Sequence, residues 1–302
     1  MKILLTGAGS FIGRHLAVHL AGVGIQVIGT YRTESPAISE LRNRTPRIEL
    51  IRLNLADERD FGVLPGSIDA VVHVAGVSPM LGVTIDDMLS INVTGTRNVH
   101  LYALKSKAEK FIYASTLSVY GQITVAHVDE ATPIVAPGSY GASKYLAERI
   151  LCETSGELPA IAVRLPGVLG RGAHRAWIPT LAEKFIANET VAIYNPAAMF
   201  NNAAHVLDVS NLISHLIQEK SWRGFFAFPI GAGGSSTVGQ VVRKLREQLG
   251  SISTVEIGGM TKHSFCINST FAMQYFGYAP MHIEKMLNCY VNEISQRSNG
   301  EC

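Results

Sequence analysis

Tyr140 and Lys144 stand four residues apart in the segment YGASK. If this segment is helical, the two side chains lie on one face, one turn apart. A lysine ammonium beside a phenol favours the phenolate and lowers a pKa that starts at about 10. Tyr140 is therefore predicted to exchange a proton with a hydroxyl group near neutral pH. The spacing also occurs by chance, and a tyrosine on a helix is often a packing residue.

A second segment with hydroxyl side chains, ASTLSVYG at 114–121, precedes Tyr140 and closes the β-rich run Lys110 to Ser115. At the C-terminal end of a parallel strand, a side chain faces the crevice where open α/β sheets bind ligands. Thr116, with Ser115 directly before it, is therefore a candidate to hydrogen-bond a substrate oxygen.

A glycine-rich turn opens the chain. The apolar run Lys2 to Thr6 leads into GAGSFIG at 7–13, and a helical pattern follows from Phe11 to Ala21. Glycines in such a turn let the backbone approach a pyrophosphate, and the helix N-terminus supplies free N–H groups and a positive dipole end. This context predicts dinucleotide binding, although glycines also serve ordinary turns.

The elements that must position these motifs alternate along the first half of the chain. Further β-rich runs occupy 25–30, 48–53, 70–74 and 160–165, and further helical patterns occupy 85–104 and 140–152. Strands alternating with helices predict an α/β fold, a doubly wound parallel sheet with helices on both faces. After Leu165 the alternation loosens. We expect helices at 178–187, 209–219, 238–249 and 282–295, strands at 191–194, 225–230 and 254–257, a loop at 231–236, and a frayed tail at 296–302.

The three motifs together resemble those of the extended short-chain dehydrogenase/reductase family, whose N-terminal motif is TGxxGxxG. Thr6, Gly7 and Gly13 keep that motif, and Ser10 stands at its middle glycine. The resemblance implies a Rossmann-type dinucleotide-binding domain over 1–165 and a smaller, mostly substrate-binding α/β part over 166–302. It implies that Thr116, Tyr140 and Lys144 are catalytic, with Lys144 also holding the nicotinamide ribose.

The resemblance extends over nearly the whole chain. RLPGVLG at 164–170 is similar to the family's RxxNVYGP, with Gly167 at its Asn, and HVLDV at 205–209 is similar to HVDD. His73, in a stretch similar to HxAG, is interpreted as a core histidine. The implied cofactor-binding residues lie in the glycine turn, at strand ends and in the catalytic segments: Gly7, Gly9, Ser10, Phe11, Ile12, Gly13, Tyr31, Arg32, Asn54, Leu55, Val74, Ala75, Gly76, Asn92, Ser115, Tyr140, Lys144, Pro166 and Val168.

The end of the second predicted strand indicates which cofactor is bound. A strand that binds NAD usually ends in Asp or Glu, which holds the ribose 2′-hydroxyl. Here Tyr31 and Arg32 close the strand, and no acid occurs before Glu34. Arg32 can hold a 2′-phosphate through two hydrogen bonds, or it is a solvated surface arginine. We therefore expect NADP or NAD, with NADP favoured.

The resemblance implies a small-molecule substrate, a nucleotide sugar. Many members place an arginine shortly before HVDD to hold the pyrophosphate; Asn201 stands there, and Arg171 and Arg175 are replacements unless they are merely solvent-exposed. The loop 77–81 is apolar and is expected to approach the sugar. Leu117 and Ser118 follow Thr116 where a dehydratase has Asp-Glu, which argues against 4,6-dehydration. The candidate substrate residues are Ser78, Thr116, Arg171 and Asn201.

The predicted function is therefore that of an NAD(P)-dependent oxidoreductase or epimerase acting on a hydroxyl or keto carbon of a nucleotide sugar. Two alternatives remain open: an NADPH-dependent reductase of a non-nucleotide carbonyl compound, and a cofactor-sensing regulatory protein. The intact Thr116, Tyr140 and Lys144 count against the sensor, because sensing needs no proton donor.

Composition excludes several other classes. The 302 residues carry 26 basic and 24 acidic side chains, a net charge of +2, with 47% hydrophobic residues. This is a globular composition, and the near balance of charge argues against a nucleic-acid partner. The four cysteines form no CxxC pair, so no metal site is expected. No apolar stretch approaches a membrane span or a secretory segment, so a cytoplasmic protein without a membrane partner is expected. Helices at 92–104 and 140–152 carry apolar residues that permit a homodimer.

Overall fold

The computed structural model describes residues 1–259 and 263–295, so the tail at 296–302 that was expected to fray lies outside the described residues. The chain forms two compact units. Unit 1 comprises Met1–Gln122, Pro133–Arg164 and Ser210–Phe228, and unit 2 comprises Ile123–Thr132, Leu165–Val209 and the described residues from Pro229 onward. Sequence alone places one boundary after Leu165. The segment 210–228 nevertheless belongs to unit 1, because its strand forms an edge of the central sheet.

Unit 1 is built on a seven-stranded sheet with the order β12-β7-β5-β4-β1-β2-β3. β1 pairs in parallel with β2 and β4, β2 with β3, and β4 with β5. The strand order reverses beside β1, which creates a topological switch point between β1 and β4. The doubly wound α/β fold is thus confirmed. The strands are β1 Lys2–Thr6, β2 Gln26–Tyr31, β3 Ile48–Arg52, β4 Ala70–His73, β5 Lys110–Thr116, β7 Ala160–Leu165 and β12 Phe225–Pro229.

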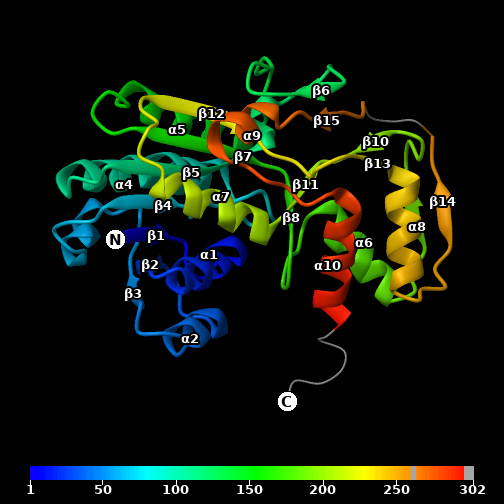
Figure 1. Ribbon diagram of the computed structural model, residues 1–302, viewed down its shortest axis with the longest axis horizontal. Helices are drawn as coiled ribbons and strands as arrows, with labels where there is room; N and C mark the ends of the chain where they lie inside the picture. Colours follow the sequence, from blue (N-terminus) through cyan, green and yellow to red (C-terminus); the bar gives the residue numbers. More distant parts are fainter. Residues whose placement is uncertain (260–262, 296–302) are drawn as a thin grey trace. The chain divides into compact units, whose positions relative to one another are not determined.

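The central strands are apolar because helices bury them. All four residues of β4 and all six of β7 are buried, as expected for strands covered on both faces. α4 (Gly95–Lys105) and α5 (Ser139–Glu153) share one core cluster with strand residues such as Val71 and Phe111. Figure 1 shows α1 (Phe11–Gly22) on the other side of the sheet from α4 and α5.

The helix predicted over 85–104 is divided in the structure. It consists of α3 (Ile85–Met88), a π-helical segment η2 (Leu89–Thr94) and α4. A π-helical turn within an α-helix often marks a functional position, and here it contains the buried Asn92. Sequence analysis also missed the short helices α2 (Pro36–Arg42), η1 (Glu58–Val63) and η3 (Leu117–Tyr120).

Unit 2 has a core of its own, formed by α6, α8, α10 and short strands. Its helices are α6 Trp177–Ile186, the first turn of α7 Val206–Gln218, α8 Val238–Gln248, α9 Thr270–Phe276 and α10 Ile283–Ser295. Its strands form four pairs: β8 Gly167–Leu169 with β11 Ala203–His205, β9 Val191–Ile193 with β14 Val255–Ile257, β10 Met199–Phe200 with β13 Ser236–Thr237, and β6 His127–Val128 with β15 Cys266–Ile267. The predicted strands at 191–194 and 254–257 are confirmed as β9 and β14. Sequence analysis missed the other six, which are too short for a period-two pattern.

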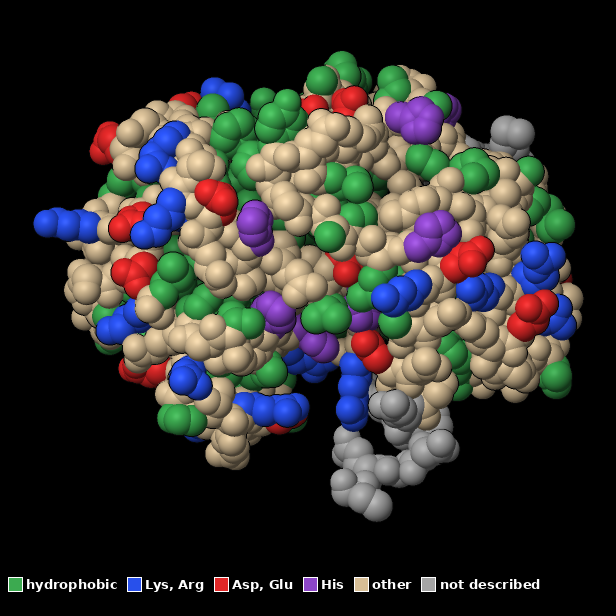
Figure 2. All heavy atoms as spheres, in the orientation of Figure 1, with side chains coloured by type: hydrophobic (Ala, Val, Ile, Leu, Met, Phe, Trp, Pro, Cys, Tyr) green, Lys and Arg blue, Asp and Glu red, His purple; other side chains and the backbone are tan. Residues whose placement is uncertain are grey.

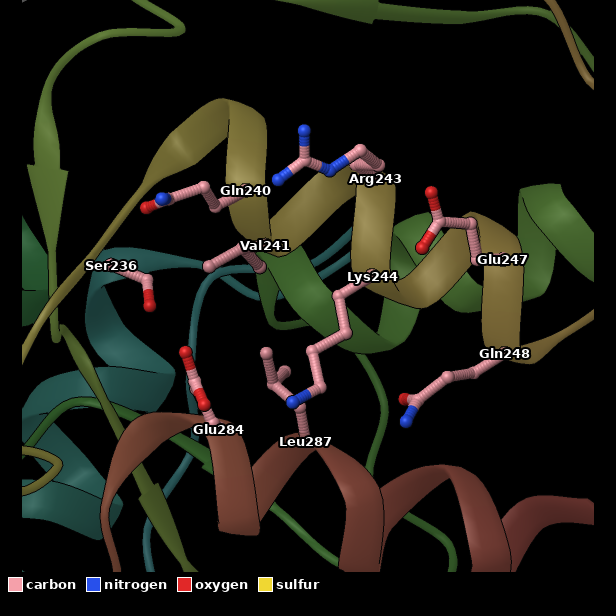
Figure 3. A pocket seen from close by; sticks show the side chains of 9 residues that line it. All are labelled: Ser236, Gln240, Val241, Arg243, Lys244, Glu247, Gln248, Glu284 and Leu287. Carbon is pink, nitrogen blue, oxygen red and sulfur yellow. The ribbon is translucent and has the colours of Figure 1, made fainter.

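A hollow of about 330 Å³ lies between α8 and α10 in unit 2. Figure 3 shows Lys244 from α8 and Glu284 from α10 extending into it. It contains none of the residues that the motifs single out. Within the described ranges, no helix has the length and apolar character to cross a membrane, and no cluster of three or more metal-binding side chains occurs.

Candidate active site

The glycine-rich turn presents bare backbone at the switch point. Gly7 has a φ of +72°, and a Cβ on it would lie 2.9 Å from the Cα of Ala75, at the end of the neighbouring strand. A Cβ on Gly13 would collide with the carbonyl oxygen of Gly7. Ser10, the departure from the family motif, accepts a 3.0 Å hydrogen bond from the Gly13 N–H and so caps α1. The turn therefore keeps the open backbone and helix N-terminus that a pyrophosphate requires.

The backbone that leaves β4 passes beside Lys144. A Cβ on Gly76 would lie 3.0 Å from Asn92 Oδ1 and 3.6 Å from Lys144 Nζ. The Asn92 amide holds this segment, since Oδ1 accepts from the Val77 N–H at 2.8 Å and Nδ2 donates to the Val77 carbonyl at 2.9 Å. Nδ2 also donates to the Ser143 hydroxyl at 3.0 Å. Asn92 thus connects the end of β4 to α5 and leaves the Gly76 backbone exposed.

His73 is a core histidine, as predicted. Thr96 donates to the Asn92 carbonyl at 2.6 Å, so the Thr96 hydroxyl accepts from His73 Nε2 at 2.9 Å. The other ring nitrogen, Nδ1, then accepts from the Thr6 hydroxyl at 2.6 Å. Burial lowers the pKa of His73 to about 3, helped by the charge of Lys144. The ring is therefore neutral at physiological pH.

Thr116 and Tyr140 meet at the carboxyl end of β5. Thr116 is the last residue of β5, and Tyr140 lies in the first turn of α5. A Cβ on Gly141 would collide with the Ser118 carbonyl oxygen, so glycine here lets α5 approach the turn after β5. Burial raises the pKa of Tyr140, and a side-chain hydrogen bond with Thr116 opposes that rise. The structure thus places the two predicted hydroxyl groups next to each other, and the Thr116 hydroxyl also donates to Ser118 Oγ at 3.3 Å.

Lys144 is buried, with 3% of its surface exposed. Its Nζ lies 4.1 Å from the centroid of the Tyr113 ring, a cation–π distance. Burial lowers the pKa of Lys144 to about 7, and the charge of Glu148 opposes this. The predicted fall in the pKa of Tyr140 is wrong in its net direction, because burial raises that pKa. The buried lysine loses its own proton at a lower pH than the phenol does.

Glu148 and Arg164 form a buried ion pair that sequence analysis missed. Their side chains are 1% and 7% exposed, and Arg164 Nη2 and Nε donate to the carboxylate at 2.7 and 3.1 Å. Burial alone would lower the pKa of Arg164, but the hydrogen bonds and charge of Glu148 outweigh that effect and raise the pKa. The Ser115 hydroxyl also donates to Glu148, at 2.5 Å, so it points at the carboxylate. The available signal was the spacing, since Glu148 follows Lys144 by one further helical turn.

The predicted adenosine end of the site is an open hollow of about 450 Å³. It is lined by Arg32, Arg52, Leu53, Asn54, Arg59, Asp60 and Val63. Arg59 pairs with Asp57, with Nη2 and Oδ2 at 2.7 Å. The Arg32 guanidinium makes no hydrogen bond within 1–259 and 263–295. The pKa of Asp87 is lowered mainly by hydrogen bonds from Thr84, and the charge of Arg32 adds to this. Figure 2 shows Lys and Arg side chains over α2 of this unit.

The other predicted cofactor residues take different positions. Phe11, Ile12, Tyr31, Val74, Ala75 and Pro166 are half-buried, and Leu55 and Val168 are buried in the two cores. Leu55 accepts from Asn98 Nδ2 through its carbonyl, at 2.9 Å. The buried Leu55 is therefore not open to a ligand, whereas its neighbour Asn54 is exposed.

The predicted substrate residues divide between the two units. Ser78 in unit 1 is half-buried, and Arg171 in unit 2 is exposed. Asn201 in unit 2 is buried, and its amide binds backbone: Oδ1 accepts from the Ile267 N–H at 2.7 Å, and Nδ2 donates to the Ile267 carbonyl at 2.8 Å. Its side chain therefore holds unit 2 together rather than facing a ligand. Asp208 of HVLDV likewise accepts from the Met281 N–H, at 2.9 Å.

The chain has similarities to several known proteins. The profile of the NAD dependent epimerase/dehydratase family matches residues 3–225. A UDP-N-acetyl-alpha-D-glucosaminuronate decarboxylase from Bacillus cytotoxicus is 28% identical over 240 residues, 72% of each chain. A 3-beta-hydroxysteroid dehydrogenase from Mycolicibacterium neoaurum is 25% identical over 182 residues, which are 57% of this chain and 48% of that protein. The crystal structure of UDP-glucuronic acid 4-epimerase from Bacillus cereus in complex with NAD has a TM-score of 0.83 at 21% identity, covering 98% of this chain and 99% of that one.

Proposed function

The chain belongs to the NAD dependent epimerase/dehydratase family, and on that premise we propose that it is an NAD(P)-dependent oxidoreductase or epimerase acting on a nucleotide sugar. The reacting group is a hydroxyl or keto carbon. The observation that carries the proposal is the contact of Thr116 with Tyr140, one helical turn from the buried Lys144. The decarboxylase relative, whose name includes a UDP-sugar acid, supports this substrate class.

The residues of unit 1 fit a nicotinamide dinucleotide. The bare backbone of the glycine turn accommodates the pyrophosphate, because a side chain on Gly7 or Gly13 would close the turn. Lys144 lies close to the exposed backbone of Gly76, where its ammonium can donate to ribose hydroxyls. When bound, the nicotinamide supplies the carbon that accepts or releases a hydride.

Each catalytic side chain has a separate task. Tyr140 accepts the hydroxyl proton of the substrate as its carbon is oxidised, or donates a proton when a keto group is reduced. Thr116 hydrogen-bonds the same oxygen and orients it. Lys144 stabilises the phenolate in its cationic form. Burial of Tyr140 and Lys144 excludes water, so these interactions are stronger than they would be in solvent.

For the cofactor we propose a preference for NADP over NAD. The hollow at the ends of β2 and β3 carries Arg32, Arg52 and Arg59, and its one acidic residue, Asp60, accepts from the Asn54 N–H at 3.0 Å. A 2′-phosphate would contact Arg32 in particular, because that guanidinium is not already bonded to an acid. β2 itself has no carboxylate for a ribose 2′-hydroxyl, and Glu34, three residues after the strand, is already paired with Arg42 at 3.2 Å.

A reductase of a non-nucleotide carbonyl compound is the second candidate. The loop after β4 exposes Met80 at 48% and Leu81 at 102% of their surfaces. An apolar loop suits a less polar substrate, and one relative is named as a steroid dehydrogenase. A cofactor sensor is disfavoured, because it has no use for the Thr116–Tyr140 contact.

We retain Ser78, Thr116 and Arg171 as proposed substrate contacts, and we assign Asn201 a structural part. A homodimer through α4 and α5 also remains a proposal. Leu146 on α5 is 47% exposed, whereas Val99 on α4 is fully buried in the core. Light scattering of the protein tests the dimer, and a mass of one chain would count against it.

Thermal shift tests cofactor and substrate separately, because a ligand stabilises the folded state that binds it. We expect the melting temperature to rise more with NADPH than with NADH. In the presence of cofactor, UDP-glucose or UDP-glucuronic acid should raise it further. A response to 3-keto steroids but to no nucleotide sugar would favour the second candidate, and no response to either cofactor would refute the proposed function.

A further inference from the structure

The ammonium of Lys144 is enclosed by groups from three elements. Tyr140 and Glu148 lie one turn away on either side of it along α5, and the ring of Tyr113 on β5 faces its Nζ at 4.1 Å. His73 on β4 stacks on Tyr113, with ring centroids 5.4 Å apart. The pKa of His73 is about 3 and that of Tyr113 is raised by burial, so both rings are neutral at physiological pH. Within the described residues, Glu148 is the anion that acts on Lys144.

The carboxylate of Glu148 is fixed in place by three hydrogen bonds. Arg164 from β7 donates two hydrogen bonds to it, and Ser115 from β5 donates a third. Arg164 is fixed in turn, because its guanidinium lies over the ring of Tyr120 at 4.8 Å. The ends of β5 and β7 therefore hold one negative charge against the middle of α5.

We propose that Glu148 is a positioning residue for the catalytic centre: held by Arg164 and Ser115, it keeps Lys144 in the cationic form that Tyr140 requires. Ser115 directly precedes Thr116, so the same carboxylate also fixes the end of β5 from which Thr116 reaches Tyr140. The consequence for turnover rests on the proposed function. The ionisation of Lys144 does not, because it is a property of the protein alone.

Replacing Glu148 with glutamine keeps the shape and removes the charge. Burial then acts on Lys144 unopposed, and the lysine loses its proton at a lower pH. The cation is present below its midpoint and lost above it, so Glu148→Gln should leave Lys144 mostly neutral at pH 7. The turnover rate in the direction in which Tyr140 donates a proton should fall. The alkaline limb of its pH–rate profile should move to lower pH. A replacement that only loosened packing would not move this limb.

The direct test is an NMR titration of the full-length protein labelled with 13C at the lysine ε-carbons. The Lys144 signal is assigned by its absence from Lys144→Arg. We expect its midpoint to fall by about 1–3 pH units in Glu148→Gln, the size of one nearby opposite charge. Glu153→Gln, an exposed change near the end of the same helix, should leave the midpoint where it is. An unchanged midpoint in Glu148→Gln would overturn the proposal whether or not any substrate is turned over.

A second variant keeps the test decisive if Glu148→Gln does not fold. Glu148→Gln combined with Arg164→Met removes both buried charges, which proteins often tolerate. Because Glu148 rather than Arg164 acts on Lys144, the midpoint should still fall, by about as much as in the single variant. A midpoint equal to that of the wild type in this folded double variant would also overturn the proposal.

Discussion

The two ends of the proposed cofactor site in unit 1 use charge in opposite ways. At the nicotinamide end, Lys144, Glu148 and Arg164 are all at most 7% exposed as whole residues, and burial shifts the pKa of Lys144 to about 7. At the adenosine end, Arg32 and Arg59 are exposed, and the Arg59 side chain pairs with Asp57 while 90% exposed. The lowered pKa of Asp57, about 2, comes mainly from its hydrogen bonds with Arg59.

Burial decides what such charges do. A charge removed from water interacts strongly with its neighbours, so a few buried groups can set the proton affinities that the chemistry needs. Exposed charges are screened and contribute little to stability, but they remain available to a ligand phosphate. We therefore expect the buried end to determine rate and stability, and the exposed end to determine cofactor choice.

The largest effect is expected from Tyr140→Phe, which removes only the phenolic hydroxyl at the buried end. Loss of general acid–base catalysis lowers kcat by about 10²–10⁴-fold. Cofactor affinity and melting temperature should change little, as titration of NADPH fluorescence and thermal melts will show. A packing tyrosine would behave in the reverse way, with lost stability and retained turnover.

The next largest effect is a loss of stability, which should occur at the buried end of the site and not at the exposed end. Arg164→Met leaves the Glu148 carboxylate buried without its partner, which costs about 3–5 kcal/mol. Arg59→Met, its matched control at the exposed end, should leave the urea midpoint nearly unchanged. Equal losses of stability in the two variants would contradict the view that burial makes the charges at one end more important for stability than those at the other.

The pH dependence of turnover reports on the buried lysine. The pKa of Lys144 is lowered to about 7, so its cation is present below that pH and is lost as the pH rises through it. In the direction in which Tyr140 donates its proton, kcat should fall about tenfold per pH unit well above 7. A flat profile from pH 6 to 9 would show that the neutral lysine suffices. Raising the salt concentration should not move the limb, since the group is buried.

The smallest effect is expected at the exposed end. Arg32→Ala should weaken NADPH binding about tenfold, a loss of about 1.4 kcal/mol, and leave NADH binding unchanged. High salt should reduce the NADPH preference of the wild type, in contrast to its lack of effect on the Lys144 limb. Fluorescence titration of both cofactors checks this, and a tenfold preference of the wild type for NADH would contradict the account.

The two ends also differ in what sequence analysis could predict. The glycine turn, Thr116, Tyr140 and Lys144 could be proposed from the sequence, because motif spacing and strand–helix alternation are local properties. Glu148 and Arg164 were missed, since their pairing joins α5 to β7 and depends on how the sheet is assembled. The direction of the Tyr140 pKa was wrong for the same reason: burial, which local sequence does not report, raises it. Asn201 occupied a motif position, yet its partner at Ile267 lies 66 residues away.

The most direct test of the central claim follows the absorbance of reduced nicotinamide after the protein, loaded with NADP+ or NAD+, is mixed with a panel of nucleotide sugars that includes UDP-glucose and UDP-glucuronic acid. The account predicts that at least one sugar produces reduced nicotinamide in the wild type. The Tyr140→Phe variant should bind the same ligands, but reduced nicotinamide should form about 10²–10⁴-fold more slowly in it. Equal rates in the two proteins, or no reduced nicotinamide with any sugar, would contradict it.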